Sequence, residues 1–306
     1  IFDPIFVTGG ILDCYGYWNV KKYIPSLNQN YPSYTGIKSE RISFIKSHQN
    51  VLYTKGINWS FRSFDGGSTW HKIDSLSVPS IHPRDFHFKG DSIFVISGNH
   101  FYRSFDNGTT WAHFTGVYGT NITRLNNELY VGSNSDSVYK SSDWGTTWQT
   151  LPTINPTNEG GYVLAFQDSV LFAAIWQGDV YKFNQSTQTW SPSLLSSSQG
   201  STVRLFDIGG TLVYSGTGTG QLYISTNGGN TWTHPHILGL PTITNIGGTL
   251  DTLMPQYIAL YNGLWLGSVP NYGFYTSSDN GDNWQALQMN ALPFKKADFT
   301  IMNDVI

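Results

Sequence analysis

The segment Ser63–Trp70, which reads SFDGGSTW, decides the fold because its pattern returns along the chain. The pattern is Ser-x-Asp-x-Gly-x-Thr-Trp. Further copies read SFDNGTTW ending at Trp111, SSDWGTTW at Trp148, STNGGNTW at Trp232 and SSDNGDNW at Trp284, with a worn copy, FNQSTQTW, at Trp190. Successive tryptophans are about 37 to 52 residues apart, close to the repeat length of propeller blades and solenoids.

The flanks of the pattern repeat as well. An aromatic residue stands nine positions before each tryptophan: Phe61, Tyr102, Tyr139, Tyr181, Tyr223 and Tyr275. Short apolar runs precede these aromatic residues: NVLYTKG, DSIFVIS, NELYVGS, DSVLFAA, GTLVYSG and NGLWLGS. Runs of β-branched and aromatic residues between Gly, Asn and Asp predict strands. No long apolar segment has the 3.6-residue period, so we expect few helices.

The pattern has a physical role in a tight turn. Asp and Ser side chains hydrogen-bond nearby backbone, Gly supplies a positive φ, and Trp packs into the sheet interior. Asn replaces Asp in one copy and can bond the backbone in the same way. We therefore interpret these residues as structural: Asp65, Gly67, Trp70, Asp106, Gly108, Trp111, Asp143, Gly145, Trp148, Asn227, Gly229, Trp232, Asp279, Gly281 and Trp284.

These octapeptides resemble the Asp-box, also called the BNR repeat, over residues 45–290 or so. The resemblance implies an all-β propeller of four-stranded antiparallel blades, with each box between the third and fourth strands. The boxes of that family lie away from the face that usually binds ligands. Its members include sialidases, sortilin-type domains, some xyloglucanases, photosystem assembly propellers and many secreted bacterial proteins, so the fold alone does not select a function.

The chain is expected to form one domain, residues 1–306. The C-terminal ADFTIMNDVI predicts a first strand and the N-terminal IFDPIFVTGG a second, so both ends together predict a closing blade that removes exposed sheet edges. Seven blades are expected, with six as the alternative. The approximate units are 41–80, 81–118, 119–155, 156–198, 199–240 and 241–292, with 293–306 plus 1–40 as the closing blade.

Composition excludes several classes of function. Charged residues make up 12% of the chain, the net charge is −3, and no basic run suggests a nucleic-acid partner. No apolar stretch approaches the length of about 20 residues that spans a bilayer. Cys14 is the single cysteine, so an intramolecular disulfide and a thiolate zinc site are both excluded. We expect no cofactor and no metal.

The function predicted is a non-enzymatic extracellular or cell-surface recognition module that binds a protein or a glycan. Export is inferred from the family resemblance, because no signal peptide is visible, and the chain is expected to belong to a larger multidomain protein or complex. Exposed aromatic rings contact sugars and proteins, although the same rings can pack between blades. The ligand-binding residues expected on the loop face opposite the boxes are Trp59, Arg84, His100, Trp176, Arg204 and Tyr272.

Two histidine motifs admit a second interpretation. IHPRDFH holds His82, Arg84, Asp85 and His87, and THPH holds His234 and His236. Histidine can bind metals or move protons, but residues of opposite parity on a strand point to opposite faces. A surface loop with a local Arg–Asp pair is the interpretation we prefer for the first motif.

The alternative function is a sialidase-like glycoside hydrolase. That family uses an arginine triad, for which Arg41, Arg124 and Arg204 are the candidates here, and a Tyr/Glu nucleophile pair. The chain has three glutamates, of which Glu128 falls in a hairpin and Glu159 in a loop, so paired catalytic carboxylates are not evident. Xyloglucanases of the same family pair two propellers around a cleft, which one propeller cannot supply.

Overall fold

The computed structural model describes residues 5–8, 20–24, 29–32, 37, 44–55, 59–73, 85–133, 137–154, 161–166, 170–175, 179–194, 203–216, 221–244, 248, 250–269, 271–287 and 298–301. Its regular secondary structure in this part is entirely β, and no helix occurs there. The chain divides into two compact units. Unit 1 comprises Ile1–His82, Ile237–Pro241 and Pro255–Ile306, and unit 2 comprises Pro83–His236 and Thr242–Met254.

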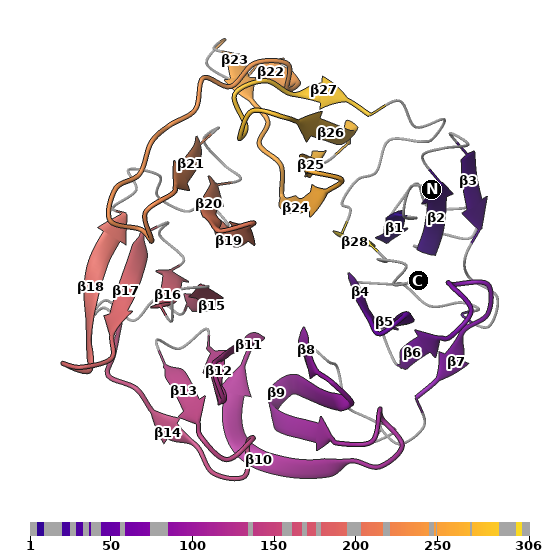
Figure 1. The fold of residues 1–306 in the computed structure, drawn as a ribbon, viewed down its shortest axis with the longest axis vertical. Helices are drawn as coiled ribbons and strands as arrows, with labels where there is room; N and C mark the ends of the chain where they lie inside the picture. The colour runs from indigo at the N-terminus through magenta and orange to yellow at the C-terminus, as the bar shows by residue number, and fades with distance from the viewer. Residues whose placement is uncertain are drawn as a thin grey trace. The chain divides into compact units, whose positions relative to one another are not determined.

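Unit 2 contains four antiparallel sheets in chain order, with their first strands in contact (Figure 1). A short hairpin, β22–β23, follows them. The strands are β8 Asp85–Lys89, β9 Ser92–Ser104, β10 Ala112–Gly119; β11 Asn121–Leu125, β12 Glu128–Gly132, β13 Val138–Ser141, β14 Gln149–Thr150; β15 Gly161–Phe166, β16 Val170–Ile175, β17 Val180–Asn184, β18 Thr189–Leu194; β19 Val203–Ile208, β20 Thr211–Gly216, β21 Gln221–Ser225; β22 Thr242–Thr244 and β23 Leu250–Thr252.

Unit 1 contains three four-stranded sheets. Their orders are β28-β1-β2-β3, β4-β5-β6-β7 and β24-β25-β26-β27. The strands are β1 Ile5–Thr8, β2 Val20–Ile24, β3 Gln29–Pro32, β4 Phe44–His48, β5 Val51–Lys55, β6 Ser60–Ser63, β7 His71–Lys72, β24 Tyr257–Tyr261, β25 Leu264–Val269, β26 Gly273–Ser277, β27 Gln285–Ala286 and β28 Asp298–Ile301.

The six apolar runs become the second strands of six sheets, or the first half of β9, and are buried on both faces. In β16, Leu171 and Ala173 pack in one cluster with residues of the β11–β14 sheet. Their neighbours Phe172 and Ala174 pack in a different cluster, with Leu212 and others of the β19–β21 sheet. Consecutive side chains thus face opposite neighbouring sheets, as the two-residue period of a strand requires.

The fold is a β-propeller, which confirms the all-β prediction with antiparallel four-stranded blades. Two of the six sheets that carry the repeat depart from four separate strands. In the β8–β10 sheet, β9 is one strand of 13 residues that includes the predicted SGNH loop. The chain still turns back there as predicted, because the Asn107 N–H donates to the Asp91 carbonyl at 2.9 Å and so joins the two ends of β9. In the β19–β21 sheet, the outer strand is reduced to one bridge between Ile224 and Thr233.

The six sheets that carry the repeat are six blades, the alternative count. The two ends of the chain pair as expected, because β28 lies antiparallel to β1 with Phe6 opposite Thr300. Within unit 1, β28 also contacts β4 and β24. The side chains of the sheet formed by both termini lie outside the described residues, so its packing as a seventh blade stays a prediction, as do the single domain and the blade boundaries.

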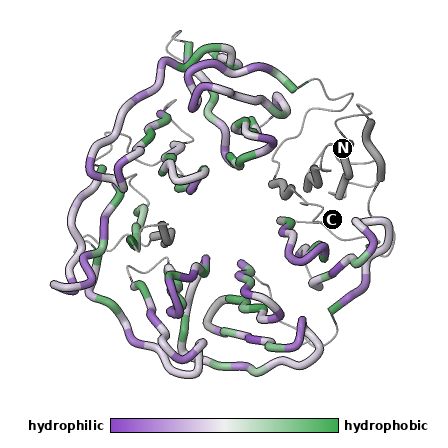
Figure 2. Tube along the Cα trace, in the orientation of Figure 1, coloured by the Kyte–Doolittle hydropathy of each residue, from purple (hydrophilic) through white to green (hydrophobic). Residues whose placement is uncertain are grey.

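Hydrophobic and hydrophilic positions alternate over short distances along the described strands (Figure 2). Alternation is typical of strands with one polar face, whereas the second strands, which are buried on both faces, are nearly continuous apolar runs, as in β16. Within the described residues, no helix has the length and hydropathy needed to cross a membrane.

Gly145 and Gly228 both adopt a left-handed backbone conformation, but only Gly145 is packed closely against a neighbouring side chain. Both have a positive φ, +83° and +64°. A Cβ on Gly145 would overlap the buried Phe101 ring, whereas a Cβ on Gly228 would meet open space.

We expect Gly145→Ala to destabilise the protein more than Gly228→Ala. Each alanine takes a left-handed conformation that costs about 1–2 kcal/mol. Gly145→Ala adds an overpacking cost of about 1–3 kcal/mol. Urea denaturation of both variants measures the difference, and equal midpoints would contradict the close packing of this turn on Phe101.

Candidate functional site

The repeated turn is organised around one serine hydroxyl. Ser63 Oγ accepts a hydrogen bond from the buried backbone N–H of Gly67 at 2.8 Å and donates to Asp65 Oδ1 at 2.8 Å. The Asp65 carboxylate also accepts from the backbone N–H of Thr69 at 2.8 Å and from its hydroxyl at 2.6 Å. The serine and aspartate side chains thereby replace the backbone partners that the turn lacks.

The same arrangement recurs in all five good copies. The serine-to-Asp/Asn and glycine-to-serine hydrogen bonds measure between 2.7 and 3.0 Å. The glycine of each turn has a positive φ, between 72° and 93°. The residue before it does as well, and in one turn that residue is Trp144, whose ring stacks on Phe94 at 5.7 Å between centroids. Packing therefore holds this tryptophan in an otherwise unfavourable conformation.

The turn hydrogen bonds keep the aspartates ionised. Burial raises the pKa of Asp65, but the hydrogen bonds from Thr69 and Ser63 together outweigh it and lower the pKa from 3.8 to about 2. The Thr110 hydroxyl and amide lower the pKa of Asp106 to about 2. The Thr147 amide and hydroxyl do the same for Asp143. Such carboxylates hold no proton to donate at neutral pH.

The Asn227 turn shows how the arrangement works without a charge. Asn227 Oδ1 accepts from Ser225 Oγ and from the Thr231 N–H, both at 3.0 Å. Its amide Nδ2 donates to Thr231 Oγ1 at 2.7 Å, which reverses the direction of the hydroxyl bond seen in the aspartate turns. The turn therefore uses an Asp or Asn oxygen, together with a second group that matches the hydrogen-bonding direction of its partner, Thr231 here and Asn283 in the Asp279 turn.

In unit 2, a basic side chain of one sheet hydrogen-bonds the repeated turn of the next sheet. Arg103 Nη1 donates to the carbonyls of Asp143 and Trp144, at 3.2 and 2.8 Å, and to Thr146 Oγ1 at 2.7 Å. Lys182 Nζ, on β17 of the β15–β18 sheet, likewise donates to the Gly228 carbonyl at 3.1 Å, in the turn of the β19–β21 sheet. Sequence analysis missed these links, although a basic residue follows the repeated aromatic in four copies: Arg62, Arg103, Lys140 and Lys182.

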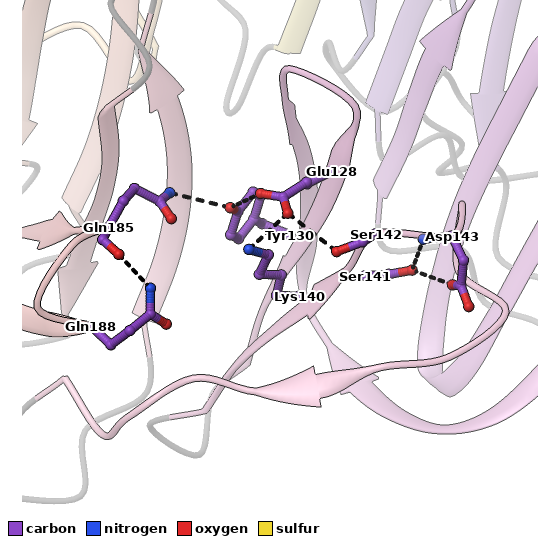
Figure 3. A network of polar contacts seen from close by, with 8 residues as sticks. All are labelled: Glu128, Tyr130, Lys140, Ser141, Ser142, Asp143, Gln185 and Gln188. Carbon is purple, nitrogen blue, oxygen red and sulfur yellow. Dashed lines mark hydrogen bonds and ion pairs between the residues drawn. The ribbon is translucent and has the colours of Figure 1, made fainter.

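The worn copy interrupts this series, and a different network takes the place of the cation–turn contact there (Figure 3). Lys140 Nζ pairs with Glu128 Oε1 at 2.7 Å, and Tyr130 OH donates to Glu128 Oε2 at 2.7 Å. Gln185, next to the worn turn, donates from Nε2 to Tyr130 OH at 3.3 Å. Burial raises the pKa of Tyr130, and its side chain is fully buried. Gln185 therefore links this Tyr–Glu pair of β12 to the neighbouring sheet.

The two expected ligand-binding residues of unit 1 lie in contrasting surroundings. Trp59 precedes β6, packs against the cluster of Leu52 and Trp70, and has Lys72 Nζ 2.9 Å from its ring centroid. Tyr272 lies between β25 and β26 and is 46% exposed. Tyr272 is therefore an exposed ring, whereas Trp59 is packed against its neighbours.

Unit 2 holds the other described candidates. Arg204 is half-buried on β19. His100 Nδ1 lies 2.8 Å from His113 Nε2, a partner that sequence analysis missed because no motif contains it. Burial, followed by the charge of His100, lowers the pKa of His113. Arg84 and Trp176 lie outside the described residues.

The remaining sequence candidates are not brought together. Arg124 Nη1 donates to the Asn126 carbonyl in its own hairpin, while Arg41 and Glu159 lie outside the described residues. Asp85 accepts from the Ile122 N–H at 3.0 Å and so links β8 to β11. His234 Nδ1 lies 2.8 Å from the Pro235 carbonyl oxygen. Among the described residues, no group of three His, Cys, Asp or Glu is placed to hold a metal ion.

The lowered aspartate pKa values predict an acid-sensitive fold. Because the folded pKa of Asp106 lies below its ordinary value, its stabilising contribution is complete above about pH 4 and is lost as the pH falls towards 2. Asp106→Asn copies the natural Asn227 turn and removes that titration. Urea denaturation between pH 2 and 6 should therefore show a weaker pH dependence for Asp106→Asn, and an unchanged slope would contradict the assignment.

Comparison with known proteins supports the fold. No protein-family model matches the chain. The chain is 26% identical to a xyloglucanase from Paenibacillus sp over 225 positions. This match covers 63% of the chain and 20% of that protein. A xyloglucanase from Acetivibrio thermocellus is 26% identical over 169 positions, 49% of this chain and 18% of that protein. The chain thus spans about a fifth of the length of these relatives.

Three solved structures are similar over most of the chain. YCF48 bound to D1 peptide has a TM-score of 0.63 at 16% identity and covers 87% of this chain and 85% of its own. YCF48 from Cyanidioschyzon merolae has a TM-score of 0.57 at 18% identity, covering 80% and 83%. The GH74 xyloglucanase from Xanthomonas campestris has a TM-score of 0.64 at 14% identity, covering 96% and 52%. At these identities the likeness establishes the β-propeller fold.

Proposed function

We propose that this chain is a non-enzymatic recognition module that binds a protein or a glycan through the loops opposite the repeated turns. The observation that carries the proposal is the exposed ring of Tyr272. Strand β26 begins at Gly273, directly after Tyr272, and ends at Ser277, where the repeated turn begins. Tyr272 and the turn therefore lie at opposite ends of one strand. A tyrosine ring with a free face suits stacking on a sugar or contact with a protein.

The chemistry of the described carboxylates supports a role in binding. Asp65, Asp106 and Asp143 are engaged by turn hydrogen bonds, and their pKa values of about 2 leave them without a proton to donate. Glu128 is held by Lys140, Tyr130 and Ser142. General acid catalysis needs a carboxyl that is protonated at the working pH, which these groups are not.

The five turns are proposed to be Asp-box repeats. Their shared hydrogen bonds, from glycine N–H to serine and from serine to Asp or Asn, give a common physical basis to the octapeptides. With that assignment, the turns of each blade are structural and the opposite loops are free to vary with the ligand.

The comparisons support both classes of partner. A propeller of similar fold, YCF48, has been solved bound to D1 peptide, which favours a protein partner. Xyloglucanases at 26% identity favour a glycan partner. Because the chain spans about a fifth of those relatives, we propose that it works beside further domains in an extracellular or cell-surface protein.

A glycan array that includes xyloglucan oligosaccharides and sialylated structures tests the proposal. We expect reproducible binding to one glycan class. If the Tyr272 ring is a binding hot spot, the binding free energy should be weaker by about 1–3 kcal/mol in Tyr272→Ala. Phe105→Ala is the matched control, because Phe105 is 54% exposed within a repeated turn.

The possible outcomes separate the alternatives. Unchanged binding in Tyr272→Ala would place the binding site elsewhere, and an equal loss in Phe105→Ala would show that the loss is not specific to Tyr272. A blank array would favour the protein partner, to be pursued by peptide-array binding with the same two variants. Release of reducing sugar or sialic acid by the purified chain would contradict a non-enzymatic module.

A further inference from the structure

The outer half of the β9–β10 pair carries two histidines on one face. His113 is opposite Tyr102, and Thr115 is opposite His100, so all four side chains share that face. Phe101 and Phe114 occupy the other face, where they pack with Trp148 in the cluster against the β11–β14 sheet. The histidine face therefore has a rigid backing of packed aromatic side chains.

The two imidazole rings are held close together over Tyr102. His100 Nδ1 lies 2.8 Å from His113 Nε2. The His113 ring stacks on the Tyr102 ring with a centroid distance of 4.7 Å and an angle of 11°. Tyr102 is almost fully buried, whereas His113 is exposed and His100 is half-buried. A fixed ring beneath and solvent above suit a site that an ion in water can reach.

The two nitrogens are close enough to bind a single metal ion. With metal–nitrogen distances of about 2.0 Å, two ligands at a right angle are roughly 2.8 Å apart, and two tetrahedral ligands are roughly 3.3 Å apart. Square-planar and octahedral coordination by nitrogen are typical of Cu²⁺ and Ni²⁺. The observed 2.8 Å is the length of the hydrogen bond between the two rings, and it places both nitrogens near enough for one ion to bind both once they turn towards it.

We propose that His100 and His113 chelate a divalent transition-metal ion that imidazole nitrogen favours, Ni²⁺ or Cu²⁺, with water in the remaining positions. Binding replaces the proton that the two nitrogens share and needs the rings to turn their lone pairs towards the ion. The stack on Tyr102 limits the motion of His113, which lowers the entropic cost of chelation. The site does not depend on the recognition role proposed above.

Calorimetric titration with NiCl₂ of the purified, untagged chain tests this site. We expect one saturable site, weakened by roughly 100-fold in His113→Phe, because one nitrogen alone loses the effective concentration of the second. Phenylalanine keeps the ring stacked on Tyr102 and removes the ligand nitrogen. His71→Phe is the control, since His71 is an exposed histidine on β7, directly after Trp70.

Each outcome decides the proposal. Loss of the site in His113→Phe and in His100→Phe, with His71→Phe unchanged, would support the chelate. Circular dichroism of each variant shows whether the sheets persist. Equal Ni²⁺ affinity in folded wild type and His113→Phe, or no saturable binding at millimolar NiCl₂, would overturn it.

Discussion

The structure depends on a serine hydroxyl that accepts from a glycine amide and donates to an Asp or Asn oxygen in each repeated turn. The glycine N–H is buried, and a buried N–H without a partner costs about 1–3 kcal/mol. In the Ser104 turn the two bonds measure 2.8 and 2.7 Å. Because the glycine has a positive φ, the chain turns sharply and delivers the following tryptophan to the sheet; Trp111 Nε1 then donates to the Gly108 carbonyl at 3.2 Å.

The same turns join neighbouring sheets of unit 2. Two turns direct backbone carbonyls at a cation from the preceding sheet, Arg103 in one case and Lys182 in the other. Where the repeat is worn, Lys140 pairs with Glu128 instead, and Gln185 completes the link through Tyr130 (Figure 3). In unit 2, the repeated turns therefore hold neighbouring sheets together as well as closing each blade.

The sequence was sufficient for the repeat, the strands and the β-class, because tight turns and doubly buried strands each require specific residue types. It also predicted the turn at SGNH, where β9 folds back so that Asn107 hydrogen-bonds Asp91, although the strand is continuous through those residues. The His100–His113 pair was beyond sequence reasoning, because its closeness depends on the register of β9 and β10. Trp59 shows the same difficulty: its sequence context resembles that of an exposed loop aromatic, while Leu52, Trp70 and Lys72 pack around it.

Residue-resolved hydrogen exchange tests the role of the serine hydroxyl most directly. The amides to follow are those of Gly67, Gly108, Gly145, Gly229 and Gly281. If the serine bonds hold the turns, these amides exchange as slowly as the buried second-strand amides, such as that of Leu129, although they lie in surface turns. Exchange at the rate of unbonded loop amides, while the strands stay protected, would contradict the claim that the fold depends on these turns.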